Sequence, residues 1–201
     1  MEGPAGTIIT AAGLFAVTNI DGLIVLTALF MASASGLPRP WQIVLGQYLG
    51  FTVMVIISVL AAAGLVFVPD RWVGLIGALP LGLGAWGLVR ARADPAEETS
   101  SWVGTFSSVV GVILANGADN ISVYIPLFAV LPPDRIAVTI AVFFVLVGVW
   151  CAAARLLGGN KKVVSALVSV GRWLVPVVFM AIGIAILIKT GVVPRLLGFS
   201  P

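Results

Sequence analysis

Two acidic side chains stand alone in apolar segments of this sequence, and carboxamides and hydroxyls accompany both of them. Asp119 lies in the run Asn116-Gly117-Ala118-Asp119-Asn120-Ile121-Ser122, and Asp21 lies in the run Thr18-Asn19-Ile20-Asp21-Gly22. Each acid is the only charged residue of its apolar segment. An aspartate at the centre of a transmembrane helix costs roughly 2.5 to 3.5 kcal/mol. Acids placed at such a depth therefore predict a functional site.

The side chains around the two acids supply oxygen ligands. Residues three or four apart share a face of a helix, which places Asn116 and Ser122 with Asp119, and Thr18 with Asp21. The sequence has no histidine and a single cysteine, Cys151, so a site rich in His or Cys is excluded. Oxygen ligands suit a hard or borderline divalent cation. The candidate ligands are Asp21, Asp119, Asn116, Asn120, Asn19, Thr18 and Ser122.

The pairing of Asp21 with Asp119 also predicts proton chemistry. Two ionised carboxylates that are close together in a medium of low dielectric repel each other, so at least one of them is expected to hold a proton when the site is empty. A cation that binds would displace this proton. The two acids therefore predict exchange of a divalent cation for protons.

The composition is that of an integral membrane protein. Of the 201 residues, 60% are hydrophobic and only 9% are charged, whereas an average soluble domain has about 25% charged residues. The mean hydropathy is +1.17. We expect residues 1–201 to form a single transmembrane domain whose partner is the lipid bilayer. The net charge of +3 does not indicate binding to nucleic acid, because the charges lie in short segments between long apolar runs.

The apolar runs predict an all-α membrane protein with six transmembrane helices. A span needs about 20 apolar residues. The first and fourth spans are long enough to be bent or broken near the midplane, at Gly13 and Gly22 in the first and at Gly117 and Pro126 in the fourth. The six predicted spans are about 6–34, 41–68, 72–89, 103–130, 135–157 and 172–190.

The two acidic segments belong to an internal repeat. An offset of 119 − 21 = 98 pairs Asp21 with Asp119 and also aligns Val25 with Val123 and Phe30 with Phe128. A repeat of three spans enters the membrane from the opposite side in its second copy. The sequence thus predicts two inverted three-helix repeats, residues 1–97 and 98–201, which bring both acids to one midplane site.

The distribution of basic residues predicts the orientation. Six spans place both termini on the same side of the membrane. Seven Lys and Arg residues fall in or next to the loops after spans one, three and five, and four fall on the opposite side, which favours both termini outside. The seven are Arg39, Arg90, Arg92, Arg155, Lys161, Lys162 and Arg172, and the four are Arg71, Arg135, Lys189 and Arg195.

Three motifs carry a resemblance to a known family. They are Thr18-Asn19-Ile20-Asp21, the run Asn116-Gly117-Ala118-Asp119-Asn120-Ile121 with Tyr124-Ile125-Pro126-Leu127-Phe128, and Gly46-Gln47-Tyr48-Leu49-Gly50. The chain resembles the cadmium-resistance transporter (CadD) family within the LysE transporter superfamily. The resemblance implies a six-span protein of the bacterial inner membrane that exports Cd²⁺ or a related divalent cation such as Mn²⁺, Zn²⁺ or Ca²⁺. In that family a second acid usually follows the first, and here Gly22 takes its place.

Other interpretations remain open at this stage. The same scaffold could export amino acids or other small organic solutes, or it could be a membrane scaffold or sensor that transports nothing. An enzyme is not expected, because no pair of nucleophile and base is visible, and no cofactor is expected. A homodimer is left open. The carboxamides and Thr18 could instead hold helices together, Ser122 could bond to its own backbone, and Gln47 is expected near the end of its span in a structural role.

Overall fold

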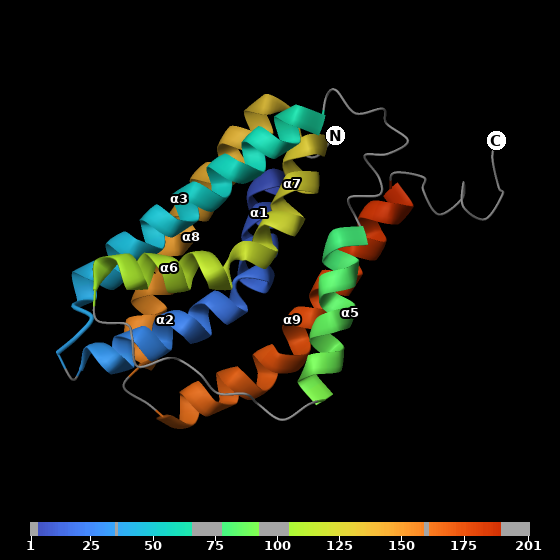
Figure 1. Cartoon of the computed structure of the whole chain (residues 1–201). Helices are drawn as coiled ribbons and strands as arrows, with labels where there is room; N and C mark the ends of the chain where they lie inside the picture. The colour runs from blue at the N-terminus through green and yellow to red at the C-terminus, as the bar shows by residue number, and fades with distance from the viewer. Residues whose placement is uncertain (1–3, 35, 66–77, 93–104, 159–160, 190–201) are drawn as a thin grey trace, which may run out of the picture.

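The chain is built from helices in every part that the structure describes. The computed structural model describes residues 4–34, 36–65, 78–92, 105–158 and 161–189, and these contain no strand. The predicted all-α class is therefore confirmed for this part of the chain (Figure 1). The helices are α1 (Pro4–Thr18), α2 (Ile20–Ser33), α3 (Pro40–Gly64), α5 (Ala78–Arg92), α6 (Phe106–Asn116), α7 (Ala118–Val130), α8 (Pro133–Leu157) and α9 (Lys161–Lys189).

Two helices are long and apolar enough to cross a membrane alone. They are α3 and α8, each of 25 residues, which corresponds to about 37 Å at 1.5 Å per residue. The pairs α1 with α2 and α6 with α7 also meet this criterion if each pair is counted as one span. The described residues thus contain two to four candidate spans, as expected for a multi-pass membrane protein.

The first and fourth predicted spans are both broken. The axes of α1 and α2 differ by 59°, and those of α6 and α7 differ by 62°. The second break lies at Gly117, as predicted. The first break lies at Asn19, so its prediction at Gly13 or Gly22 was wrong, because these glycines lie within α1 and α2. Pro126 lies inside α7, away from the break.

The break at Asn19 has a local physical cause. Its backbone (φ −111°, ψ 22°) lies outside the helical region, close to that of Gly117 (φ −92°, ψ 5°). The Asn19 carboxamide donates to the carbonyl of Phe15 at 3.0 Å, and this carbonyl also accepts the backbone N–H of Asn19 at 3.0 Å. The indole N–H of Trp150 donates to the Asn19 carbonyl at 2.8 Å and fixes this conformation.

Each long helix packs against one broken pair. Helix α3 lies against α6 and α7, α8 lies against α1 and α2, and α5 lies beside α9 (Figure 1). The contact between α3 and α6 is close because α3 presents glycines. A Cβ atom at Gly46 would lie 2.8 Å from the side chain of Val109, and one at Gly50 would lie 2.7 Å from Ile113.

Buried aromatic rings fill the space between these helices. Phe15 packs against Phe51, Phe143 and Trp150 with ring centroids 5.3 to 5.7 Å apart. Tyr124 packs against Phe143 at 5.1 Å. Because the rings come from α1, α3, α7 and α8, this core holds both broken pairs in place next to the two breaks.

The third and sixth predicted spans correspond in part to α5 and α9. Helix α5 covers residues 78–92, and the start of the predicted span at 72 lies outside the described residues. Helix α9 begins at Lys161, earlier than the predicted start at 172, and contains Pro176. Helix α5 has 15 residues, and the apolar stretch described within α9, Pro176–Ala185, is also shorter than a full span.

Candidate functional site

The structure brings Asp21 and Asp119 together at the two helix breaks. Asp21 lies in the first turn of α2, and Asp119 lies in the first turn of α7. Asn116, three residues before Asp119, donates to Asp21, so both acids lie next to the contact of α2 with α6. The N-terminus of a helix carries a positive partial charge that favours a carboxylate, so each break partly stabilises the acid that follows it.

Asp21 has one oxygen that is bound and one that is not. The carboxamide nitrogen of Asn116 donates to Oδ2 of Asp21 at 3.1 Å. Oδ1 of Asp21 is buried and has no hydrogen-bond partner among the described residues, and the same holds for Oδ1 of Asn120. A buried acceptor left without a partner costs about 1–3 kcal/mol. These two oxygens are therefore the atoms that a bound cation would satisfy.

The carboxamides connect the two breaks. The backbone N–H of Asn120 donates to Oδ1 of Asp119 at 3.0 Å. The side chain of Asn120 donates to Oδ1 of Asn19 at 3.3 Å. In turn, the side chain of Asn19 donates to Oγ1 of Thr18 at 3.0 Å and to the hydroxyl of Tyr124 at 2.9 Å. A continuous network thus joins the end of α1 to the start of α7.

The two predicted hydroxyl ligands are bound to their own backbone. Thr18 donates to the carbonyl of Leu14 at 2.9 Å, and Ser122 donates to the carbonyl of Asp119 at 2.6 Å. Each keeps lone pairs on its oxygen. For Ser122, the bond to its own backbone is the alternative to a ligand role that the sequence left open.

A small cavity lies between the breaks. Its volume is about 10 Å³, close to the least that can hold one water molecule. Gly22 also borders it, with Asn116 as the nearest side chain to its Cβ position, at 3.9 Å. The lining residues are Asn19, Gly22, Val25, Gln47, Met54, Ile113, Asn116, Gly117 and Asn120.

Asp21 and Asp119 are not among the residues that line this cavity, whereas two lining side chains that could bind a cation were not among the predicted ligands. Gln47 and Met54 reach it from α3 and are 7% and 2% exposed. Gln47 was expected near the end of its span, but the structure places it beside the carboxamides of the breaks. Residues seven apart lie two turns apart on one helix face, so their spacing could have been noticed. The sequence does not show which face of α3 meets the site.

The acids alone do not form a larger cluster. Within the described ranges, no group of three or more His, Cys, Asp or Glu side chains is placed to hold a metal ion. A cation at the breaks would therefore be held by two carboxylates together with neutral ligands.

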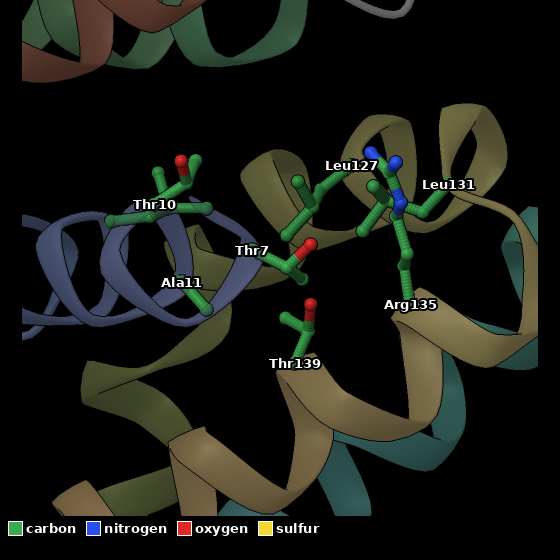
Figure 2. Close-up of a pocket in the computed structure, with 8 residues that line it drawn as sticks. Thr7, Thr10, Ala11, Leu127, Leu131, Arg135 and Thr139 are labelled. Atoms are coloured by element: carbon green, nitrogen blue, oxygen red, sulfur yellow. The ribbon is translucent and has the colours of Figure 1, made fainter. Parts of the chain in front are cut away.

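A second cavity, of about 50 Å³, lies between α1, α7 and α8 (Figure 2). Thr7, Thr10 and Thr139 border it, and the side chain of Arg135 extends along it toward α7. It contains none of the predicted ligands. It approaches the breaks through Leu14, whose carbonyl accepts the hydroxyl of Thr18.

Fold and site together define a multi-pass helical membrane protein that carries a buried polar site at two helix breaks. The sequence model of one protein family, described as cadmium resistance transporter, matches residues 15–199. The chain therefore belongs to the cadmium resistance transporter family, as the motifs predicted. This is a family of transporters and not of enzymes, which confirms the expectation that the chain is not an enzyme. Comparison with curated proteins and with solved structures gave no significant match.

Proposed function

We propose that this protein exports Cd²⁺ or a related divalent cation in exchange for protons, with Asp21 and Asp119 as principal ligands and proton carriers. One observation carries the proposal. An oxygen of Asp21 is buried without a hydrogen-bond partner among the described residues, and it belongs to a carboxylate that interacts with a second one. Membership in the cadmium resistance transporter family supports the choice of cargo.

The remaining ligands come from the carboxamides. Asn116 uses its nitrogen to bind Asp21, and this leaves its oxygen for a cation. Asn120 offers a buried oxygen without a partner in the described part of the chain. Asn19, Thr18 and Ser122 are supporting ligands that also hold the breaks in shape. Hard and borderline divalent cations accept such mixed sets of carboxylate and carbonyl oxygens.

The exchange follows from charge balance. Without a cation, two carboxylates at this depth repel each other, and protons relieve the repulsion. A divalent cation brings its own positive charge and displaces the protons. Outward cation flux and inward proton flux are then coupled because both compete for Asp21 and Asp119.

The inverted repeat is supported by the positions of the breaks. Asn19 and Gly117 are separated by 117 − 19 = 98 residues, the same offset that aligns the two acids. The two bend angles are similar, at 59° and 62°. In addition, α3 of the first repeat packs on the broken pair of the second, and α8 of the second repeat packs on the broken pair of the first. A two-fold axis that relates the repeats requires this arrangement. We infer that one repeat rocks against the other around the site.

The two halves differ in a way that suits such a cycle. Gly46 and Gly50 let α3 approach α6 closely, whereas the corresponding contact between α8 and α1 borders the larger cavity. We interpret the close contact of α3 with α6 as the closed side of the site. The cavity beside the contact of α8 with α1 is then its partly open side. The larger cavity is then the vestibule on the open side.

The alternative of an exporter for amino acids has less support. The cavity at the breaks has a volume of only about 10 Å³, and a cationic side chain that could hold a carboxylate is not among its lining residues. We therefore retain the divalent cation as cargo.

Proteoliposomes that contain a pH-sensitive dye test this function. A Cd²⁺ gradient across the wild-type protein is expected to drive protons in the opposite direction. Asp21→Asn and Asp119→Asn are expected to abolish both fluxes, and Asp134→Asn, an exposed acid at the start of α8, serves as the control. Metal flux without proton movement would refute the coupling, and unchanged metal flux in Asp119→Asn would refute the site.

A further inference from the structure

Met54 places a thioether sulfur beside the break at Gly117. The side chain is 2% exposed and borders the same cavity as Asn116 and Asn120. The space that a Cβ atom at Gly117 would need is occupied by the sulfur and methyl group of Met54. The glycine at this break therefore allows the sulfur to approach the ligands of the proposed cation site.

A thioether changes the chemistry of that site. The sequence led us to expect oxygen ligands only, and these suit hard cations. Sulfur ligands are soft and polarizable, and they favour soft cations over Mn²⁺ or Ca²⁺. Cd²⁺ is softer than Mn²⁺, Zn²⁺ or Ca²⁺. Gln47, two turns earlier on α3, borders the same cavity and can supply one further carbonyl oxygen.

We propose that Met54 is a ligand of the transported cation and makes the site select soft divalent cations such as Cd²⁺ over hard ones. The proposal rests on the cation function proposed above for the same site. It assigns α3 a direct part in binding, in addition to the two broken pairs.

The two breaks themselves argue for a role beyond packing. At Asn19 the covering residue is Trp150, which donates its ring N–H to the break carbonyl at 2.8 Å. At Gly117 the covering residue is Met54, which has no such proton, places its sulfur and methyl group against the glycine, and lines the cavity.

Met180 provides a matched control within the chain. Its Cγ and backbone nitrogen lie next to Gly84 where α9 meets α5, so it too packs beside a glycine between two helices. It does not border the cavity at the breaks. Leucine has nearly the volume of methionine and lacks the sulfur, so Met54→Leu and Met180→Leu make the same chemical change at the two places.

Calorimetric titration of the purified protein with Cd²⁺ and with Mn²⁺ tests the proposal. Met54→Leu is expected to weaken Cd²⁺ binding by about tenfold and to leave Mn²⁺ binding unchanged, while Met180→Leu changes neither. An unchanged ratio of the two affinities in Met54→Leu would overturn the role in selectivity. Asp119→Asn, measured in parallel, is expected to lose both cations. If Asp119→Asn still binds them, the proposed function fails, independently of Met54.

X-ray absorption at the cadmium edge gives a readout that does not depend on a variant. Cd²⁺ bound to the wild-type protein is expected to have one sulfur neighbour among oxygens. That neighbour should persist in Met180→Leu and disappear in Met54→Leu. A shell of oxygen alone in the wild type would refute the proposal. A sulfur neighbour that persists in Met54→Leu would assign it to another residue, and Cys151, the only cysteine, would be tested next.

Discussion

Asp21 and Asn120 each retain an oxygen that the folded chain does not satisfy. Oδ1 of both residues is buried and has no partner among the described residues. Each such atom costs about 1–3 kcal/mol, although the surrounding helices could have supplied donors. A chain selected for stability alone would be expected to give these oxygens hydrogen-bond donors. Their presence at two helix breaks is consistent with a site whose ligands stay available for a cation.

Gly22 follows Asp21 and borders the cavity at the breaks, so a substitution there tests this site directly. The nearest atom to a Cβ there is the carboxamide nitrogen of Asn116, at 3.9 Å, so a side chain can be added without a clash at Cβ. Gly22→Asp adds a third carboxylate, and we expect it to tighten binding of divalent cations by about tenfold. Calorimetric titration with Cd²⁺ and Mn²⁺ measures this change.

The control for this variant is Gly22→Asn, which has nearly the same size and no charge. It is expected to change the affinity much less than Gly22→Asp. Equal effects of the two substitutions would mean that only the added volume matters, and that position 22 does not face the cation.

Asn19 holds the two breaks together, and its removal should lower stability. The side chain donates to Phe15, Thr18 and Tyr124 and accepts from Asn120. Asn19→Ala leaves several buried groups without partners, so we expect a loss of about 1–3 kcal/mol in the free energy of unfolding. Unfolding by a denaturing detergent, followed by circular dichroism, measures this loss.

Ser58→Ala is the matched control for Asn19→Ala. Ser58 is also buried, but among the described residues its hydroxyl donates only to the carbonyl of Met54, one turn earlier on its own helix. Its removal should change the free energy of unfolding by much less than that of Asn19. If both variants lose the same stability, the network at Asn19 does not couple the breaks.

At the scale of the elements, the sequence predicted that the first and fourth spans are broken, but it located only one break correctly. Gly117 was found because glycine is the residue associated with breaks. Asn19 was missed because its break depends on side-chain bonds to Phe15 and on Trp150 of α8, a contact 131 residues away. The internal repeat could have located this break, because subtracting its offset of 98 from the break at Gly117 gives position 19.

The close contact of α3 with α6 leads to a prediction about Gly50. A methyl group there would lie 2.7 Å from Cγ2 of Ile113, so Gly50→Ala must push the two helices apart. We expect a loss of about 1–3 kcal/mol in the free energy of unfolding, as for other overpacked interiors. Gly111→Ala, in α6, meets nothing within 4 Å and should be neutral or stabilising by up to about 1 kcal/mol.

The comparison of these two variants in detergent unfolding separates packing from helix propensity. Both replace a helical glycine by alanine, and only Gly50 lies in the contact. A stabilised Gly50→Ala variant would show that α3 and α6 can move apart at little cost, and that this contact does not close one side of the site.

At the scale of the whole molecule, composition and the length of the apolar runs predicted the class of protein and its helical architecture. The family match over residues 15–199 confirmed the resemblance of the motifs. The sequence could not show which face of α3 meets the breaks, because α3 is apolar nearly all round and its contacts come from α6, α7 and α8. For this reason Asp21, Asp119 and the carboxamides were predicted, whereas Gln47 and Met54 were not.

The orientation and the asymmetry of the two halves can be tested together by cysteine labelling. Ala11 is 4% exposed and borders the larger cavity, whereas Val109, at the matching position of the second repeat (109 − 11 = 98), is 0% exposed and lies in the contact of α3 with α6. In a Cys151→Ser background, a small charged thiol reagent that does not cross the membrane should label Ala11→Cys from outside more rapidly than Val109→Cys. Labelling of Ala11→Cys only from the cytoplasmic side would reverse the orientation predicted from the basic residues. Equal labelling of both cysteines would contradict a conformation that is closed on one side, because the two halves would then be equally open to water.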